Sequence, residues 1–152
     1  MMMFTRIHPM DADDSRYSSR GYFSNEGMDH LTYLKQRPSI FENENDLRIR
    51  QRILICAACG QPVTKVSEKI EVLGRHDHAF PYYGEIIPLG CFRNATGCLG
   101  VESISKGYSW FRGYAWQIQV CLSCFSQLGW KYISDKDSFY GLMFRTLREE
   151  NP

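Results

Sequence analysis

The 152-residue sequence has almost no excess of charge of either sign, because 18 Lys and Arg face 17 Asp and Glu for a formal net charge of +1. Acidic and basic residues are interspersed along the chain. It therefore lacks the concentrated positive charge that is typical of proteins that bind nucleic acid or anionic membranes. We expect neither a nucleic-acid partner nor a membrane partner.

Long apolar runs are also missing, and no stretch approaches the roughly 20 apolar residues that span a bilayer. The first 14 residues contain three aspartates and no apolar core of the kind that a secretory signal has, so we expect no such signal. Six cysteines in a chain without an export signal predict a reducing compartment. We therefore expect a cytoplasmic protein.

The chain does contain two cysteine pairs with the same spacing, Cys56 with Cys59 and Cys121 with Cys124. Two thiolates on each of two tight turns provide the tetrahedral sulfur set that Zn²⁺ prefers. A redox motif has no reason to occur twice, and a pair of disulfides suits secreted chains. The pattern predicts one structural zinc ion with these four ligands.

A stretch of 61 residues, 60–120, separates the two pairs. Compact zinc ribbons have about 15–20 residues at this point. A metal ion that closes so long a loop joins two distant parts of one domain and restricts the unfolded chain, so we expect it to supply much of the stability. Four thiolates leave no position for substrate, which favours a structural role over a catalytic one.

Composition changes near residue 50. Residues 1–50 are predominantly polar, and we expect an N-terminal extension that is partly disordered or forms a short helix, for example over 28–35. Residues 47–55 alternate charged and aliphatic side chains and leave helix and strand open, while 53–56 are predicted as the strand that enters the first cysteine pair. Residues 51–150 are predicted to form one zinc domain.

Beyond Cys56 the sequence predicts a mostly β domain, because short β-branched or aromatic segments alternate with glycines. The expected strands cover residues 70–73, 85–87, 116–120 and 130–133. Residues 139–150 fit either a helix or a last strand.

All three tryptophans, Trp110, Trp116 and Trp130, follow residue 105, and Tyr132 shares a strand face with Trp130. Gly113 permits a chain reversal between the first two indoles. A metal ion at the nearby cysteine pair can bring these rings together as walls for a small, flat, uncharged ring or a soft cation. Ordinary core packing of the tryptophans is the alternative that spacing leaves open.

An ordered series of motifs carries a family resemblance. It reads Cys56-Ala-Ala-Cys59-Gly60, His76-Asp-His78, Ser109-Trp-Phe-Arg-Gly-Tyr-Ala-Trp116, Cys121-Leu-Ser-Cys124, Leu128-Gly-Trp-Lys-Tyr132 and Phe139-Tyr-Gly-Leu142. From Cys56 to about Arg148 the chain resembles the thalidomide-binding (CULT) domain family, which comprises the C-terminal module of cereblon and small single-domain bacterial relatives.

The resemblance implies a β-tent, in which a structural four-cysteine zinc site pins two antiparallel sheets. It also implies a ligand-binding protein, not an enzyme, with an aromatic cage at the positions of Trp110, Trp116, Trp130 and Tyr132. Backbone groups around Ser109, at Tyr108 and Trp110, would pair with the ligand. The implied ligands are cyclic imides such as glutarimide and succinimide, uracil-like rings, and C-terminal cyclic imides of damaged proteins.

The chain departs from the family pattern at Phe80-Pro81, where relatives usually carry Asn-Pro against the ligand. We expect a more apolar pocket rim at this point. The first fifty residues show no counterpart of cereblon's Lon-like domain or ligase-adaptor region, so recruitment of a ubiquitin ligase is not implied.

Two other functions use the same residues. A methionine sulfoxide reductase on this fold would need a reactive thiol in the aromatic pocket, for which Cys91 and Cys98 are the candidates. A binder of quaternary or methylated ammonium would use the same cage through cation–π attraction. We expect buried structural roles for both thiols, with Cys98 in a turn, and hydrogen-bonding roles for His76 and His78.

Overall fold

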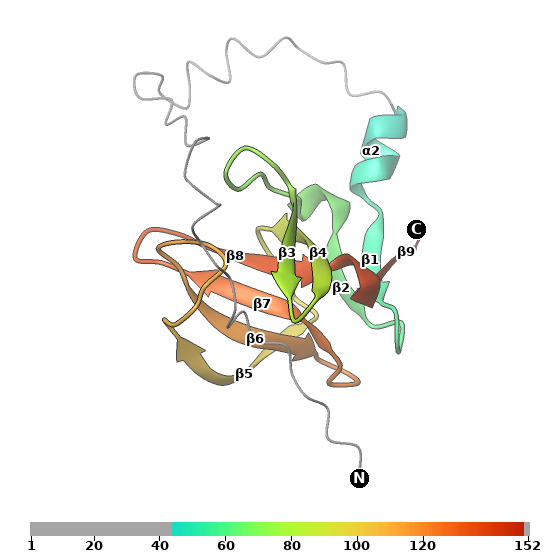
Figure 1. The fold of residues 1–152 in the computed structure, drawn as a ribbon. Coiled ribbons are helices and arrows are strands. Elements are labelled where there is room, and N and C mark those ends of the chain that lie inside the picture. The colour runs from blue at the N-terminus through green and yellow to red at the C-terminus, as the bar shows by residue number, and fades with distance from the viewer. Residues whose placement is uncertain (1–43, 151–152) are drawn as a thin grey trace, which may run out of the picture.

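The computed structural model describes residues 44–150, which form a small, mostly β domain with two antiparallel sheets (Figure 1). The extension expected over residues 1–43, including a helix at 28–35, lies outside the described residues. Within the part that is described, no helix is long and apolar enough to cross a membrane.

The described residues begin with a short helix and continue as strands interrupted by two 3₁₀ turns. The elements are α2 (Glu44–Arg50), β1 (Ile53–Cys56), β2 (Pro62–Lys65), η2 (Val66–Glu68), β3 (Asp77–Tyr82), β4 (Glu85–Phe92), β5 (Cys98–Ser105), β6 (Ala115–Cys121), β7 (Gln127–Ile133), β8 (Ser138–Met143), η3 (Phe144–Thr146) and β9 (Leu147–Glu150).

The strands divide into a small sheet with the order β2-β1-β9 and a large sheet with the order β3-β4-β8-β7-β6-β5. One continuous segment links them, because β8 of the large sheet passes through η3 directly into β9 of the small sheet (Figure 1). The expected architecture of two antiparallel sheets is confirmed.

The structure resolves the ambiguous segment 47–55 as the end of a helix followed by a strand. Helix α2 carries acidic Glu44 and Asp46 in its first turn and basic Arg48 and Arg50 in its last. This distribution suits the helix dipole, which favours negative charge at the N-terminus and positive charge at the C-terminus. The aliphatic residues that follow are buried in β1.

The structure corrects the expected strand at residues 70–73 and decides between helix and strand for residues 139–150. Residues 70–73 are not a strand: Val72 forms only an isolated bridge with Arg75, because Leu73 and Gly74 at φ of 54° and 80° turn the chain back. Residues 139–150 contain no α-helix. In this segment the 3₁₀ turn η3 lies between strands β8 and β9. The turn breaks the two-residue alternation of a strand, so the apolar residues have a helix-like spacing.

The core has two parts. The larger lies within the six-stranded sheet and contains most of the buried aromatic side chains. The smaller lies between the two sheets and is built from Leu54, Cys56, Val63, Phe92, Ala95, Cys121, Leu128 and Leu142. Burial of apolar surface supplies the main favourable free energy for both parts. The smaller part includes one cysteine from each pair, so the core and the cysteine site join the same elements.

A close backbone approach between β2 and the β4–β5 loop requires glycine at position 97. The Gly97 amide donates a hydrogen bond to the Val63 carbonyl oxygen at 3.0 Å. A Cβ atom at this position would overlap the carbonyl oxygen of Pro62 and lie 2.6 Å from Val63 Cα. Both obstacles are main-chain atoms, so a side chain cannot rotate away to make room.

We therefore predict that Gly97→Ala lowers the free energy of unfolding by about 1–3 kcal/mol, the usual cost of overpacking a tight site. Thermal unfolding monitored by circular dichroism measures the effect. Gly107→Ala is the matched control, because its Cβ would meet nothing closer than Ser105 Oγ at 3.8 Å. Equal midpoints for the two variants would contradict the prediction.

Candidate functional site

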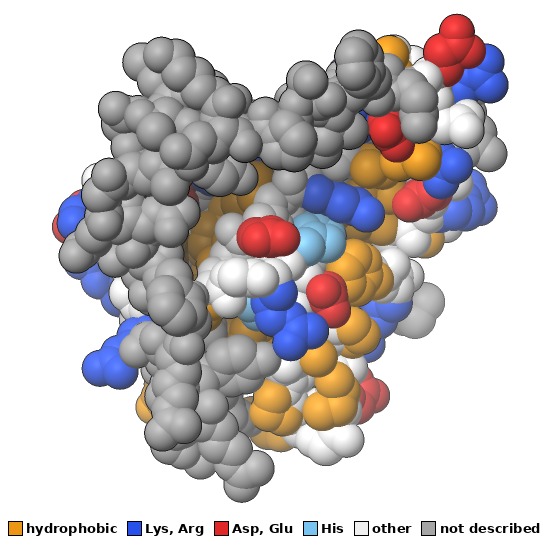
Figure 2. Space-filling view, turned by 90° about the horizontal axis from the view of Figure 1, so that it is seen from above, with side chains coloured by type: hydrophobic (Ala, Val, Ile, Leu, Met, Phe, Trp, Pro, Cys, Tyr) orange, Lys and Arg blue, Asp and Glu red, His pale blue; other side chains and the backbone are white. Residues whose placement is uncertain are grey.

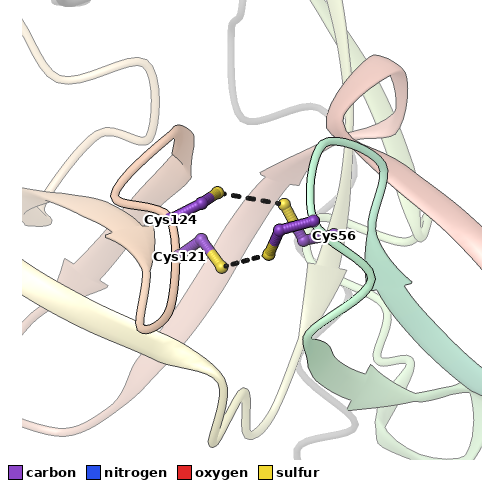
Figure 3. Close-up of side chains that lie close together, drawn as sticks. Cys56, Cys121 and Cys124 are labelled. Carbon is purple, nitrogen blue, oxygen red and sulfur yellow. Dashed lines mark hydrogen bonds between the residues drawn. The ribbon is translucent and has the colours of Figure 1, made fainter.

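The four paired cysteines, 65 residues apart between the first members of each pair, come together in the structure. Their sulfur atoms all lie within 4.8 Å of one another, with Cys56 and Cys124 at 3.7 Å and Cys59 and Cys121 at 3.5 Å (Figure 3). Sulfurs bound tetrahedrally to Zn²⁺ at about 2.3 Å would be roughly 3.8 Å apart. The donor set and its spacing therefore fit a metal ion.

The two cysteine turns have the same backbone geometry. The amides of Gly60 and Phe125 donate to the carbonyl oxygens of Cys56 and Cys121 at 2.8 and 3.0 Å. Both residues have positive φ, 79° for Gly60 and 62° for Phe125. Phe125 therefore holds a conformation that costs a non-glycine residue free energy, and the second turn keeps it in order to present its thiols like the first.

Thiol electrostatics favour a cation at the centre of the site. Burial raises the pKa of Cys56 to about 12 and also raises the pKa of Cys121. Hydrogen bonding from the Ser126 hydroxyl, whose oxygen lies 3.2 Å from Cys124 Sγ, lowers the pKa of Cys124 to about 6. Four adjacent thiolates repel one another, and a bound dication removes that cost. The four cysteines form a site that can hold a metal ion and that ties β1 to β6.

Replacing one of these ligands should release the metal. We predict that Cys59→Ser or Cys121→Ser purifies with far less than one equivalent of metal and unfolds at lower temperature, because a three-thiolate site binds less tightly. Elemental analysis by mass spectrometry gives the stoichiometry. Cys98→Ser is the control, since its thiol is outside the four-sulfur group, and it should keep the full equivalent. Undiminished metal in both ligand variants would refute the assignment.

The predicted cage residues lie together, but all of them are buried. Trp110 is 3 % exposed, Trp116 is 5 % exposed, and Trp130 and Tyr132 are 0 % exposed. Trp116 on β6 is directly opposite Tyr132 on β7, and the rings of Trp110 and Trp130 meet edge to face with centroids 4.8 Å apart. The four rings belong to one packed aromatic cluster.

Phe80 lies inside this aromatic cluster, which differs from its expected place at a pocket rim. It is 2 % exposed, and its ring stacks on Trp110 with centroids 4.9 Å apart and planes only 11° from parallel. The next residue, Pro81, is exposed. Because side chains alternate along β3, the two residues of the Phe-Pro pair point to opposite faces.

Polar atoms inside the cluster are unevenly satisfied. Trp116 Nε1 donates to the Gly107 carbonyl oxygen at 2.6 Å. Trp110 Nε1 and the Tyr132 hydroxyl are buried and have no hydrogen-bond partner among residues 44–150. Burial raises the pKa of Tyr132 well above its usual value, so the phenol stays protonated. A buried polar group without a partner costs about 1–3 kcal/mol, so an acceptor beside Trp110 Nε1 would be stabilising.

A cavity of about 740 Å³ lies beside the aromatic cluster, with a lining that mixes apolar, polar and charged residues. It is lined by Ile104, Lys106, Tyr108, Ser109, Arg112, Gly113, Tyr114, Ala115, Ile133, Ser134 and Asp135. Of the predicted ligand-binding residues, only Tyr108 and Ser109 line it. The other lining positions were not predicted as ligand-binding, although Arg112, Gly113, Tyr114 and Ala115 belong to the motif that runs from Ser109 to Trp116.

The cavity adjoins three of the segments that carry aromatic rings of the cluster. Residues 108–109 lead into Trp110, residues 113–115 lead into Trp116, and residue 133 follows Tyr132. Tyr108 itself is 65 % exposed and has a φ of 51°, a strained conformation for a non-glycine residue. The cavity therefore lies beside the segments that carry Trp110, Trp116 and Tyr132.

The two remaining thiols are separated by the fold. Cys91 lies in β4 within the aromatic cluster and is 0 % exposed, and burial raises its pKa to about 12. Cys98 begins β5 opposite Cys121 and packs beside the metal-type site, so its expected place in a turn was wrong. Neither thiol has the lowered pKa that a reactive cysteine requires.

His76 and His78 pin the turn that precedes β3, which confirms their expected hydrogen-bonding role. His76 Nδ1 lies 3.1 Å from the Ile70 carbonyl oxygen, and His78 Nε2 lies 3.0 Å from that of Val72. These nitrogens must carry the protons, because a carbonyl oxygen only accepts. The other ring nitrogens are buried without a partner among the described residues, and burial lowers the pKa of both imidazoles.

This arrangement makes stability depend on pH. With a folded-state pKa below the unfolded value near 6.5, each histidine binds protons more readily when the chain is unfolded. Stability from these residues is complete above about pH 6.5 and falls as pH drops below it, by up to about 1.4 kcal/mol per pH unit for each histidine.

Urea unfolding of wild type and His78→Gln between pH 7.5 and 5 measures this dependence. A glutamine can keep the donor to the Val72 carbonyl but cannot titrate, so its slope should be shallower. A slope identical to that of wild type would contradict the prediction.

Surface charge is mixed on the face shown in Figure 2, where Lys and Arg side chains lie next to Asp and Glu and apolar side chains fill the gaps. This face shows no broad patch of one sign. The pattern agrees with the balanced charge of the sequence.

The fold and site define a small antiparallel β domain with a four-cysteine metal-type centre. No family profile matches the chain. "Protein cereblon" from Danio rerio is 45% identical to it over 110 residues, which cover 65% of this chain and 25% of that protein. The chain therefore contains a cereblon-like domain and spans about a quarter of the length of that relative.

A solved structure also aligns with the chain. "Crystal Structure of Mis18 'Yippee-like' Domain" matches with a TM-score of 0.47 and 12% sequence identity, over 66% of this chain and 96% of that one.

Proposed function

We propose that residues 51–150 form a non-enzymatic binding module for small cyclic imides, held together by one structural Zn²⁺ at Cys56, Cys59, Cys121 and Cys124. The observation that carries the proposal is the buried Trp110 Nε1, which lies among apolar rings and has no hydrogen-bond partner among the described residues, while the two residues before Trp110 line a cavity. Its N–H group needs an acceptor that also has flat apolar faces.

A cyclic imide has this combination of groups. Its ring faces are apolar and suit indole walls, while each of its two carbonyl oxygens can accept a hydrogen bond. The imide N–H would need an acceptor, and the backbone around Tyr108 is the candidate that the family resemblance implies; Tyr108 and Ser109 line the cavity. Glutarimide, succinimide and uracil-like rings share this acceptor–donor–acceptor edge.

The cavity allows for a ligand that is larger than one ring. At about 740 Å³ it is in the range of small-molecule sites, and it lies next to the segments that carry Trp110, Trp116 and Tyr132. We propose that a C-terminal cyclic imide of a damaged protein can use this route, with its preceding main chain in the cavity. Recruitment of a ubiquitin ligase is not part of the proposal, because the chain spans only 25% of cereblon.

Zinc is the metal that the donor set favours. Four thiolates in a tetrahedral arrangement suit Zn²⁺ or an iron–sulfur centre among common metals. The sulfur separations of 3.5 and 3.7 Å leave room for a single ion. Zinc bound to four thiolates would hold β1 to β6 and would have no open position for catalysis.

The two rival functions have less support. A reductase needs a thiol with a lowered pKa in the pocket, whereas burial raises the pKa of Cys91 to about 12 and Cys98 is beside the metal-type site. An ammonium binder needs an environment that attracts cations. The cavity beside the aromatic cluster is instead lined by two basic residues, Lys106 and Arg112, and one acidic residue, Asp135.

The proposal predicts saturable binding of glutarimide and succinimide, measured by calorimetry and by tryptophan fluorescence. N-methylsuccinimide should bind at least about fivefold more weakly, because it lacks one donor and leaves an acceptor unpaired at a cost of about 1 kcal/mol or more. Trp116→Ala and the milder Trp116→Phe should weaken binding, while Leu122→Ala, on the exposed second cysteine turn, should not. No saturable heat with either imide in folded, metal-loaded protein would reject the function, and binding of choline instead would favour the ammonium site.

A further inference from the structure

Phe80 occupies the surface of the aromatic cluster that a planar ligand would need. We infer that its ring is a built-in competitor for the ligand site, so that an imide binds only by displacing it and the Phe80 side chain sets both affinity and ring selectivity. This inference rests on the proposed function and concerns the regulation of the same site.

The first argument is the stacking geometry. Phe80 lies almost parallel to Trp110, at 11° with centroids 4.9 Å apart, which is the arrangement that a flat ligand ring would adopt on an indole. The edge of Trp130 packs against the same indole at 4.8 Å and 73°. Because Trp110 is only 3 % exposed, it has no free face to offer. Tyr82, on the same strand as Phe80, approaches the indole more distantly, edge to face at 6.4 Å. A ring that stacks closely on Trp110 must therefore replace Phe80 or Trp130.

Of the two partners, Phe80 is the one whose element is less firmly held. Trp130 lies on β7, which has a hydrogen-bonded neighbour on each side, β6 and β8. Phe80 lies on β3, which among residues 44–150 is the edge strand of the large sheet and pairs with β4. An edge strand has fewer main-chain bonds to break when it moves, so displacement of Phe80 costs less than displacement of Trp130.

The second argument is what the phenyl ring fails to satisfy. Phe80 covers Trp110 with apolar surface but offers no acceptor, so Trp110 Nε1 stays buried without a partner among the described residues. An imide replaces the stack and also brings a carbonyl oxygen. The exchange therefore favours rings that carry an acceptor at the edge and disfavours plain hydrocarbon rings, which would only substitute one apolar ring for another.

Displacement also lowers the apparent affinity. A ligand that binds only the minor, Phe80-out state has its dissociation constant raised by the inverse of the fraction in that state. Minor states are commonly populated at about 10% or less, so removing the competitor should strengthen binding by about tenfold or more.

The experiment compares wild type with Phe80→Ala, Phe80→Leu and Phe80→Asn by calorimetry and stopped-flow fluorescence, with succinimide and glutarimide as probes. We expect the Ala and Asn variants to bind about tenfold tighter or more and to associate faster, although the free proteins should unfold at lower temperature. Phe80→Leu keeps bulk in the core and guards against misfolding, and it should be intermediate. Phe125→Ala is the matched control, because it removes an exposed phenyl ring at the second cysteine turn and should leave binding unchanged.

The possible outcomes separate the two proposals. If wild type binds imides as tightly as every Phe80 variant, or more tightly, the competitor role is overturned. The imide function then stays in place, with Phe80 as a wall of the site. Absence of binding by all variants, each folded and metal-loaded, would reject the imide function and the competitor role with it. Equal gains for benzene-type and imide ligands in Phe80→Ala would overturn the selectivity argument.

Discussion

Convergence of four thiols from two turns is the constraint on which the rest of the domain depends. The site joins β1 of the small sheet to β6 of the large one, and β6 with β7 carries two indoles and a phenol of the aromatic cluster. A metal ion bound here would hold together two segments that are far apart in the sequence, so the unfolded chain would have fewer conformations to lose. The ion would also fix the end of β6. The apolar core between the sheets packs around the same cysteines, so metal binding and hydrophobic burial reinforce one another.

The aromatic cluster serves as core and as candidate site at once, and these two roles conflict. A core is most stable when its rings are fully packed, as Trp110, Trp130 and Phe80 are here. A binding site needs an accessible face and unsatisfied polar groups. The structure meets only the second need: its rings are packed without an accessible face, but Trp110 Nε1 and the Tyr132 hydroxyl have no partners among the described residues. A ligand could recover the free energy that packing alone leaves lost.

Local patterns in the sequence were sufficient for several features. The two cysteine pairs predicted the metal-type site, since four thiols at this spacing suit only a few chemistries. Alternation in residues 116–120 and 130–133 predicted β6 and β7. The turn at residues 70–73 was missed because its β-branched and aliphatic residues are of the type that strands favour, while Leu73 and Gly74 with positive φ reverse the chain. Strands β2, β3 and β5 were missed because their own sequences are short or polar, and pairing partners far along the chain stabilise them.

The sequence by itself determined the cysteine ligand set, the mostly β character and the aromatic residues near the second cysteine pair, because these follow from residue type and short-range spacing. Only the tertiary structure decided that Phe80 stacks on Trp110 and that Cys91 is buried in the core. It also decided that residues from 104–115 and from 133–135 line one cavity. Phe80 and Trp110, for example, are 30 positions apart in the sequence. Register and burial set such contacts, and no local pattern encodes either.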